Sequence, residues 1–258
     1  MKTFSFCSLY YRTGIPSGAN KRFENFIFQL QKILHENEEI IVFVKKGHIP
    51  KNLEKICSIN FIEVPIFIIF DRLLSYIYLS IKFYSMRQMV ITTDFMPIPN
   101  FSLSRHIHFQ LVHDIRNFTV FKRINYMNMG HKIQMRQWRK AQNIITVSNF
   151  TKRELIDKCS INSDSIFVSP NGLEDIYFNV NPSLKRDIDI TYVATFEKRK
   201  NHRLLIKTLK KYSGSRKLEI LFIGRDHGTL ESIKNQIHKL NNINITFIDS
   251  VNNEEKIV

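Results

Sequence analysis

Residues 143–153 read NIITVSNFTKR, and this stretch decides the fold. Its first five residues are mostly apolar and β-branched, which predicts a buried strand over 143–147. Ser148 then stands where its side chain can accept a hydrogen bond from the first turn of a helix that begins near Asn149. A strand that passes directly into a helix is the repeating unit of a parallel sheet covered by helices.

The same alternation continues on both sides of this stretch. Towards the N-terminus we predict a helix with one apolar face, a basic helix at 122–142, and strands at residues 2–10, 39–45, 60–64, 88–93 and 106–112. Towards the C-terminus we predict helices at 201–212 and 229–240, and strands at 165–169, 188–195, 218–224 and 243–248.

The predicted fold class is therefore α/β, with two Rossmann-like domains built on parallel sheets. We assign residues 1–178 to the first domain, residues 179–187 to a linker, and residues 188–258 to the second domain. Because a full Rossmann domain needs ~150 residues, the second domain is expected to be incomplete.

Composition and charge narrow the partners only coarsely. The net charge is +15, from 38 Lys and Arg against 23 Asp and Glu. Such a charge favours nucleic acid, phosphorylated ligands or an acidic membrane surface, although the codon bias of an AT-rich gene explains it equally well. The basic residues are spread along the chain without a recognised binding module, so nucleic acid is not an expected partner.

The three cysteines, Cys7, Cys57 and Cys159, are far apart and odd in number, which fits a reducing cytoplasm and gives no metal-ligand spacing. The first apolar run is too short for a signal peptide. Residues 64–84 form the one membrane-like stretch, but Asp71 and Arg72 near its middle argue against a spanning helix. We expect a core helix there; the alternative is an amphipathic segment that, with the basic residues of 122–140, docks on an anionic membrane.

Ligands of open α/β sheets bind beyond the carboxyl ends of the strands, and the first candidate loop there is 14–19. Its small residues, including Gly18 and Ala19, would let a ligand approach the backbone at a helix N-terminus. The loop matches neither the dinucleotide fingerprint nor a P-loop, and from spacing alone a plain turn is favoured.

His113 and Asp114 form the second candidate, at the end of strand 106–112. A histidine at this edge can donate to a hydroxyl or phosphate oxygen, and Asp114 could orient it. A structural histidine beside a turn-forming aspartate is an equally good interpretation.

The third candidate is the charged run at 197–201, which contains Arg199 and Lys200. Two cations before a helix oppose the helix dipole unless an anion such as pyrophosphate binds between them. Arg would then act as a planar fork and Lys as a point charge, and a solvated charge run is the weaker interpretation.

Taken in order, six segments resemble the retaining family-4 glycosyltransferases, especially the bacterial mannosyl- and rhamnosyltransferase-like members. They are SGAN at 17–20, LVHD at 111–114, AQNIITVSNFTKR at 141–153, VSPNG at 168–172, YVATFEKRKNH at 192–202 and LFIG at 221–224. The resemblance spans nearly the whole chain and implies the GT-B fold of two Rossmann-like domains.

It also implies the reaction. Such enzymes move a hexose from a nucleotide diphosphate sugar, used as co-substrate without cofactor or metal, to a lipid-linked or polysaccharide acceptor. The setting would be synthesis of O-antigen, capsule or lipopolysaccharide, with the enzyme cytoplasmic or peripheral on the inner face of the plasma membrane.

The resemblance assigns roles residue by residue. His113 and Asp114 would be catalytic, with His113 on the transferred sugar, and Arg199 and Lys200 would hold the donor diphosphate. The backbone at Gly18 and Ala19 would approach the phosphates or the sugar. The remaining loops of the donor cleft would be at Asn171, Gly172, Thr195 and Gly224. Catalysis would rest on positioning and charge stabilisation.

Three departures from the family pattern stand out. Ala194 and Asp249 occupy positions where the family often has glycine, and the acidic E-x7-E region that grips the donor would lie beyond Val258. We therefore expect a chain truncated at its C-terminus. The alternative to an active enzyme is an inactive or split fragment that acts only as a folded acceptor-binding domain.

Overall fold

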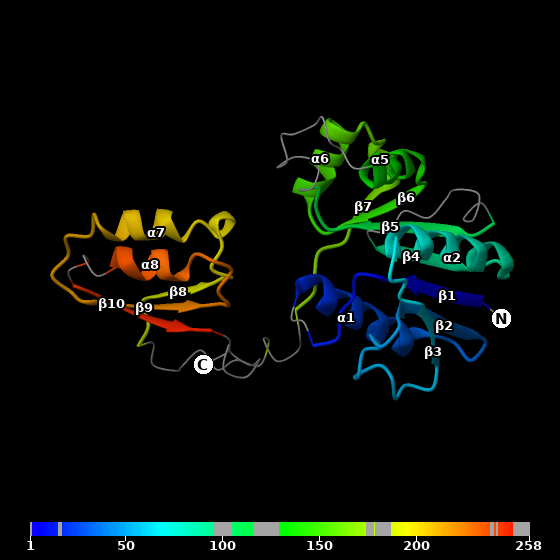
Figure 1. Ribbon diagram of the computed structural model, residues 1–258, viewed down its shortest axis with the longest axis horizontal. Coiled ribbons are helices and arrows are strands. Elements are labelled where there is room, and N and C mark those ends of the chain that lie inside the picture. Colours follow the sequence, from blue (N-terminus) through cyan, green and yellow to red (C-terminus); the bar gives the residue numbers. More distant parts are fainter. Residues whose placement is uncertain are drawn as a thin grey trace. The chain divides into compact units, whose positions relative to one another are not determined.

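The computed structural model describes residues 2–14, 17–94, 105–115, 129–173, 178, 187–237, 240 and 242–249. The chain divides into two compact units, Met1–Gly172 (unit 1) and Leu173–Val258 (unit 2), drawn in Figure 1. The predicted linker lies outside the described residues apart from Asp187, as do residues 122–128 of the predicted basic helix and the last nine residues.

Unit 1 is built on a seven-stranded, wholly parallel sheet with the order β3-β2-β1-β4-β5-β6-β7. Its strands are β1 (Lys2–Cys7), β2 (Glu38–Lys45), β3 (Ile59–Val64), β4 (Val90–Asp94), β5 (Ile107–Val112), β6 (Asn143–Thr146) and β7 (Ile166–Val168). The chain runs outward from β1 to β3, then crosses back to place β4 on the other side of β1. This reversal is the topological switch point at which doubly wound sheets bind ligands.

The α-helices of unit 1 within the described residues are α1 (Gly18–Ile33), α2 (Asp71–Ser85), α5 (Met129–Lys140) and α6 (Asn149–Cys159). Side chains of β1 alternate between the two faces of the sheet, since Phe6 packs with Phe23 and Ile27 of α1, whereas Cys7 packs with Leu79 and Phe83 of α2. A third cluster joins α5 and α6 to β6 around Trp138, Ile144 and Leu155.

The helix start that anchored the sequence argument is confirmed. α6 begins at Asn149, and the Ser148 hydroxyl accepts a hydrogen bond from the Thr151 amide at 3.1 Å. This cap sets the point at which strand β6 turns into helix at the carboxyl edge of the sheet.

The core helix predicted within residues 64–84 is present, but it is shorter than expected and is buried on one side only. Strand β3 ends at Val64, α2 begins only at Asp71, and just one side of α2 is buried. The apolar residues of this stretch lie on two sides of the helix, and the second side faces outward. Among the described residues, no helix combines the length and apolar character needed to cross a bilayer.

Unit 2 contains a parallel sheet with the order β10-β9-β8. Its elements are β8 (Ile190–Val193), the 3-10 turn η4 (Lys198–Lys200), α7 (His202–Leu209), β9 (Leu218–Ile223), α8 (Leu230–Ile237) and β10 (Ile243–Ile248). Phe196, Phe222 and Ile206 form the centre of its apolar core. The fold class predicted from sequence, α/β with parallel sheets in two Rossmann-like units, is confirmed.

Candidate functional site

The residues of the unit 1 site follow three neighbouring strands at the carboxyl edge of the sheet. Ser8 follows β1, Asp94 ends β4, and His113 follows β5. β4 pairs with both β1 and β5, so the ends of these strands are adjacent on either side of the switch point. The fold therefore brings together polar side chains that are distant in the sequence, since Ser8 and His113 are 105 residues apart.

His113 and Asp94 form a buried pair. His113 Nε2 lies 3.6 Å from Asp94 Oδ1, and the two side chains are only 13% and 5% exposed. The other oxygen, Oδ2, accepts a hydrogen bond from the Ser8 hydroxyl at 3.5 Å. The distance to His113 is longer than a hydrogen bond, so the contact is electrostatic and becomes an ion pair when the imidazole is protonated. Asp114, half-buried, follows His113 in the chain.

Asp94 was not singled out in the sequence. It ends the segment VITTD (residues 90–94), whose first four residues the sequence analysis assigns to a strand without a functional role. The missing signal was strand order, because Asp94 matters only once β4 is known to lie between β1 and β5. The carboxylate that the structure puts against the His113 ring thus comes from another strand.

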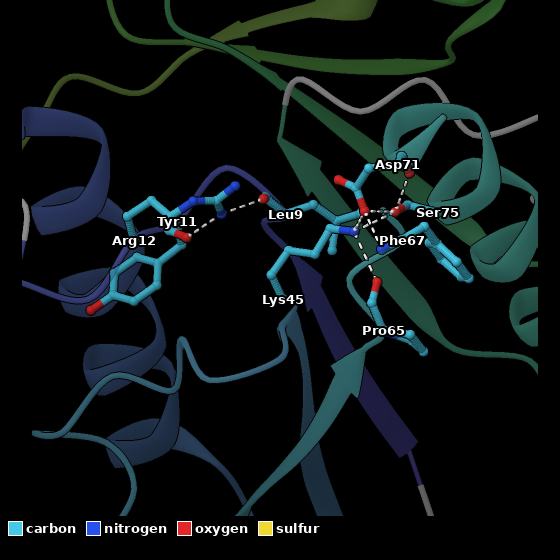
Figure 2. Close-up of polar contacts among 8 residues, drawn as sticks. All are labelled: Leu9, Tyr11, Arg12, Lys45, Pro65, Phe67, Asp71 and Ser75. Atoms are coloured by element: carbon cyan, nitrogen blue, oxygen red, sulfur yellow. Dashed lines mark hydrogen bonds and ion pairs between the residues drawn. The ribbon is translucent and has the colours of Figure 1, made fainter. Parts of the chain in front are cut away.

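The predicted glycine-containing turn leads into α1. Ser17 caps the helix by accepting a hydrogen bond from the Asn20 amide at 3.1 Å, and the helix begins at Gly18. Before it, Arg12 Nη1 donates to the carbonyls of Leu9 and Tyr11 at 2.9 and 2.8 Å, which braces the chain as it leaves β1 (Figure 2). The first turn of α1, with Gly18 and Ala19, is thereby held at the carboxyl edge.

Arg22 connects α1 to the predicted turn at Asn171. Its Nη1 donates to the Ser169 carbonyl at 2.9 Å and to Asn171 Oδ1 at 2.7 Å, and its Nη2 donates to the Ser169 hydroxyl at 3.2 Å. Burial lowers the pKa of the Arg22 guanidinium, and the nearby negative charge of Asp94 opposes this shift. Arg22, which the sequence analysis also missed, places a cation beside the predicted Asn171. Gly172 is exposed beyond it.

The chemistry of this edge suits an oxygen-rich ligand. Two helix N-termini end here, because Thr151 in the first turn of α6 donates from its hydroxyl to the His113 carbonyl at 3.3 Å. Helix N-termini carry a partial positive charge that favours anions. Together with Arg22 and the His113–Asp94 pair they offer donors to hydroxyl and phosphate oxygens.

The unit 2 site is one contiguous loop after β8. The Glu197 carboxylate accepts hydrogen bonds from the Thr195 hydroxyl at 2.9 Å and from the Arg199 guanidinium. The bond from Thr195, and then that from Arg199, lower the pKa of Glu197. The Glu197–Arg199 pair is exposed, so it is weak and leaves Arg199 able to exchange partners.

The structure puts Arg199 and Lys200 in η4, directly before α7. Asn201, with φ of 55°, separates the 3-10 turn from the helix, which begins at His202. The Tyr192 hydroxyl donates to the Lys200 carbonyl, so β8 holds the backbone of this turn. The two cations therefore stand on a fixed backbone at the carboxyl end of β8.

Gly224 lies at the same edge, one residue after β9. A Cβ at this position would overlap the Ala194 carbonyl, so only glycine allows the ends of β8 and β9 to approach this closely. The Gly224 amide donates to the Ile248 carbonyl at 2.9 Å, which continues the pairing with β10. Thr195 and Gly224 thus lie at the same edge of the unit 2 sheet.

A cavity of about 170 Å³ lies beside this loop. Glu197, Lys198 and Thr229 line it together with His202. Within the described part of the chain, neither ring nitrogen of the buried His202 has a hydrogen-bond partner. Burial lowers the pKa of His202, and the ring packs against Tyr192 and Phe196 with centroids 4.8 Å away in both cases. His202 therefore belongs to the aromatic core of unit 2.

No family model matches the chain, and no curated protein sequence matches it. Solved structures do match, and they are glycosyltransferases. A glycosyltransferase from Rickettsia africae aligns with a TM-score of 0.61 at 21% identity, over 96% of this chain and 69% of the other. The lipopolysaccharide outer core galactosyltransferase WaaB aligns with a TM-score of 0.65 at 15% identity, over 97% and 69%. Anabaena Alr3699/HepE, in complex with UDP-glucose, aligns with a TM-score of 0.62 at 13% identity, over 97% and 70%.

The chain shares the GT-B fold of these glycosyltransferases. At these identities, the similarity concerns the fold, and the chain spans about 70% of the length of each of these structures.

Proposed function

We propose that this protein is a glycosyltransferase that moves a hexose from a nucleotide diphosphate sugar to a lipid-linked or polysaccharide acceptor. The observation that carries the proposal is the His113–Asp94 pair, buried at the carboxyl edge beside the switch point of the unit 1 sheet. A ligand site is expected there on topological grounds, and the pair provides the polar chemistry that a sugar needs. The fold shared with several glycosyltransferases supports the same conclusion.

On the sugar side, His113 donates to a hydroxyl or ring-adjacent oxygen of the transferred hexose, and Asp94 keeps its ring in position. The amides of the first turn of α1, at Gly18 and Ala19, stabilise negative charge on the sugar or its phosphate. In this proposal residues 1–178 form the acceptor-side domain, and residues 188–258 bind the nucleotide sugar. Retention of the anomeric configuration and the family-4 assignment rest on the resemblance of the sequence motifs.

On the donor side, Arg199 and Lys200 bind the diphosphate, and the loops at Thr195 and Gly224 surround it. When the sugar leaves, negative charge develops on the departing phosphate, and a guanidinium and an ammonium held in place would stabilise it without a metal ion. Arg199 would exchange its exposed bond to Glu197 for the phosphate oxygens.

The setting follows from the proposed acceptor. Assembly of cell-surface glycan such as O-antigen, capsule or lipopolysaccharide takes place on carriers at the inner face of the plasma membrane. The structure of WaaB, named as a lipopolysaccharide galactosyltransferase, supports this choice of setting. We propose that the protein works in the cytoplasm or at that inner face.

The test is thermal unfolding of the purified chain with UDP, GDP, dTDP and CDP, each in large excess. A nucleotide at ~100 times its Kd adds about 2.7 kcal/mol to the free energy of unfolding, which shifts the midpoint by several degrees. The corresponding sugar nucleotides are then assayed for nucleotide release, with and without EDTA, and EDTA should change nothing. A chain that unfolds cooperatively at the same temperature with every nucleotide would overturn the donor proposal and favour the acceptor-binding fragment.

A further inference from the structure

The loops that follow β1 and β2 meet at the carboxyl edge of the unit 1 sheet. The two strands pair in parallel, so their ends are adjacent, on the side of β1 away from β4. The Thr13 hydroxyl donates to the Ile49 carbonyl at 3.4 Å, which ties the first loop to the second. This brings Arg12 of the first loop near His48 of the second, and we call these two residues the Arg12–His48 pair.

Arg12 is a half-buried cation with unused hydrogen-bond donors. Its Nη1 donates to the Leu9 and Tyr11 carbonyls, as Figure 2 shows. Among the residues that the structure describes, Nε and Nη2 have no hydrogen-bond partner, and no carboxylate pairs with the guanidinium. A guanidinium carries five N–H donors in a fixed plane, so the remaining donors of Arg12 can form paired hydrogen bonds with an oxyanion.

His48 contributes an imidazole ring with unused hydrogen-bonding capacity. Its Nδ1 is buried and has no hydrogen-bond partner among the described residues. Burial lowers the pKa of the ring, and the positive charge of Arg12 lowers it further, so the ring is neutral at about pH 7. A neutral imidazole carries one N–H donor, and no hydrogen bond within the described part of the chain fixes which nitrogen carries it. The ring can therefore donate to a ligand.

The carboxylates of α1 and β3 are already engaged. Glu24 of α1 accepts a hydrogen bond from the Tyr11 hydroxyl at 2.6 Å, and Glu63 of β3 accepts one from the Gly47 amide at 2.6 Å. Lys46, which precedes Gly47 in the turn after β2, is exposed. This edge therefore has a positive charge that an anionic ligand would balance.

Phosphate is the anion that these donors suit. Arg12 offers the planar fork that binds two oxygens, the His48 ring adds a donor from another loop, and Lys46 adds a cation nearby. Donors that come from separate loops match the tetrahedral oxygens of a phosphate better than the flat oxygens of a carboxylate. A bound phosphate would also offset the repulsion between Arg12 and the His48 ring when that ring is protonated.

We propose that the Arg12–His48 pair binds a phosphate group of the acceptor. The proposal rests on the proposed function and narrows the acceptor to molecules that carry phosphate, either a lipid diphosphate or a phosphorylated glycan. The pair belongs to unit 1, whereas the residues assigned to the donor diphosphate, Arg199 and Lys200, belong to unit 2. Acceptor and donor phosphates would thus be bound by separate residues.

Calorimetric titration of the full chain with three probes tests the proposal. Geranyl diphosphate stands for a lipid diphosphate, geraniol is the same hydrocarbon chain without phosphate, and glucose-6-phosphate stands for a phosphorylated glycan. We expect at least one of the two phosphates to bind and geraniol not to bind. Binding of geranyl diphosphate alone would indicate a lipid diphosphate as acceptor, and binding of glucose-6-phosphate alone would indicate a phosphorylated glycan.

Two variants remove the proposed contacts. Arg12→Lys keeps the charge but loses the paired hydrogen bonds, and it should weaken phosphate binding by about tenfold. His48→Leu should weaken binding by about fivefold or more, through loss of a donor to a charged group. Because Nδ1 of His48 bonds to nothing among the described residues, this variant should keep the wild-type melting temperature. In transfer assays both variants should raise the KM for the acceptor and leave the KM for the donor unchanged.

Matched controls are Arg87→Lys and His35→Leu, which make the same changes at exposed positions of unit 1. They should bind the probes like the wild type, and so should Arg199→Ala, which removes a cation of the donor site. The titrations need neither nucleotide nor transfer. A failure of phosphate binding is therefore distinguishable from a failure of the transferase proposal, which is tested by the response to nucleotide.

Two results would overturn the proposal. One is that neither phosphate binds, or that both Arg12→Lys and His48→Leu bind the phosphates like the wild type. The other is phosphate binding that is lost in Arg199→Ala and kept in His48→Leu, which would assign the phosphate to unit 2.

Discussion

The carboxyl edges of the two sheets assemble charge in opposite ways. In unit 1, the largely buried Asp94 and His113 come from separate strands and lie 3.6 Å apart, and the guanidinium of Arg22 from α1 interacts electrostatically with Asp94. In unit 2, Glu197, Arg199 and Lys200 come from one short loop, where Arg199 is exposed and the other two residues are half-buried. We therefore expect substitutions at the unit 1 edge to alter both the free energy of unfolding and the reaction rate. Substitutions at the unit 2 edge should alter ligand binding alone.

The single tryptophan of the chain makes this difference measurable. Trp138 is 1% exposed and lies in the α5–α6 cluster of unit 1. Its fluorescence therefore reports the unfolding of unit 1, whatever happens to unit 2.

The largest expected effect is a change in the free energy of unfolding with pH, which tests whether unit 1 keeps a polar side chain, His108, in its interior. Burial, and to a smaller degree His106, lowers the pKa of His108 to about 4, and its Nε2 lies 2.7 Å from the Thr93 hydroxyl. Between pH 6.5 and about 4 the unfolded chain binds a proton at this histidine that the folded chain refuses. Stability is therefore present above pH 6.5 and falls as the pH drops, by about 3 kcal/mol in total across this window.

Urea denaturation followed by Trp138 fluorescence at several pH values checks this prediction. His108→Gln, which can keep the bond to Thr93, should remove this part of the acid loss, whereas His35→Gln, at an exposed position, should keep it. Equal acid slopes in the wild type and His108→Gln would show that the histidine does not resist protonation in the folded state.

The second prediction separates the two carboxylates near His113. Asp94→Asn keeps the shape of the side chain but removes the charge that faces the ring, so we expect kcat to fall about 100-fold with little change in KM for the donor. Unit 1 should also lose about 1 kcal/mol of stability, since buried charges lose a partner. Transfer assays compare Asp94→Asn with Asp114→Asn. A larger loss of kcat in Asp114→Asn would show that Asp114, and not Asp94, orients the ring of His113.

The smallest effect is expected at the second edge. Arg199→Ala and Lys200→Ala should each weaken nucleotide diphosphate binding by about tenfold, through loss of a charge-assisted hydrogen bond. Stability should change by less than about 0.5 kcal/mol, because neither side chain is buried and the pairing of Arg199 is weak. Calorimetric titration measures the affinity, and Lys207→Ala and Lys210→Ala on the exposed side of α7 serve as controls. A marked loss of stability in Arg199→Ala would remove the contrast between the edges.

Sequence reasoning reached the fold because the determinants of fold are local. The spacing around residues 243–248 matches β10, and Ser148 caps α6 as expected. Strand length was overestimated where apolar residues continue into the loop, as at β1, which ends at Cys7 although Leu9 is also buried. Local pattern identifies an element well and its boundary less well, since the boundary depends on pairing with neighbours.

Only part of the candidate site could be predicted from the sequence. The residues at the unit 2 edge are contiguous in the chain, whereas those at the unit 1 edge come from separate elements. Arg199 and Lys200 are adjacent in the chain, so their charge pattern can be recognised from the sequence alone. Asp94, in contrast, lies beside His113 only because of the strand order, and Arg22 meets Asn171 only because of the packing of α1. For residues 64–84 the sequence left a core helix and an amphipathic segment as alternatives, because a stretch that is apolar on both sides of a helix has the composition of a core segment.

The glycines at the two edges carry one more consequence, which concerns tolerance to substitution. Position 224 is closed to every other residue, since even a Cβ there would strike the Ala194 carbonyl. Gly18 and Gly172 have open space where a Cβ would stand, and neither needs a left-handed backbone. A saturation library screened for folding should therefore reject all variants at 224 and accept most at 18 and 172. Intolerance at 18 or 172 in a screen for activity would then report a ligand passing close to the backbone.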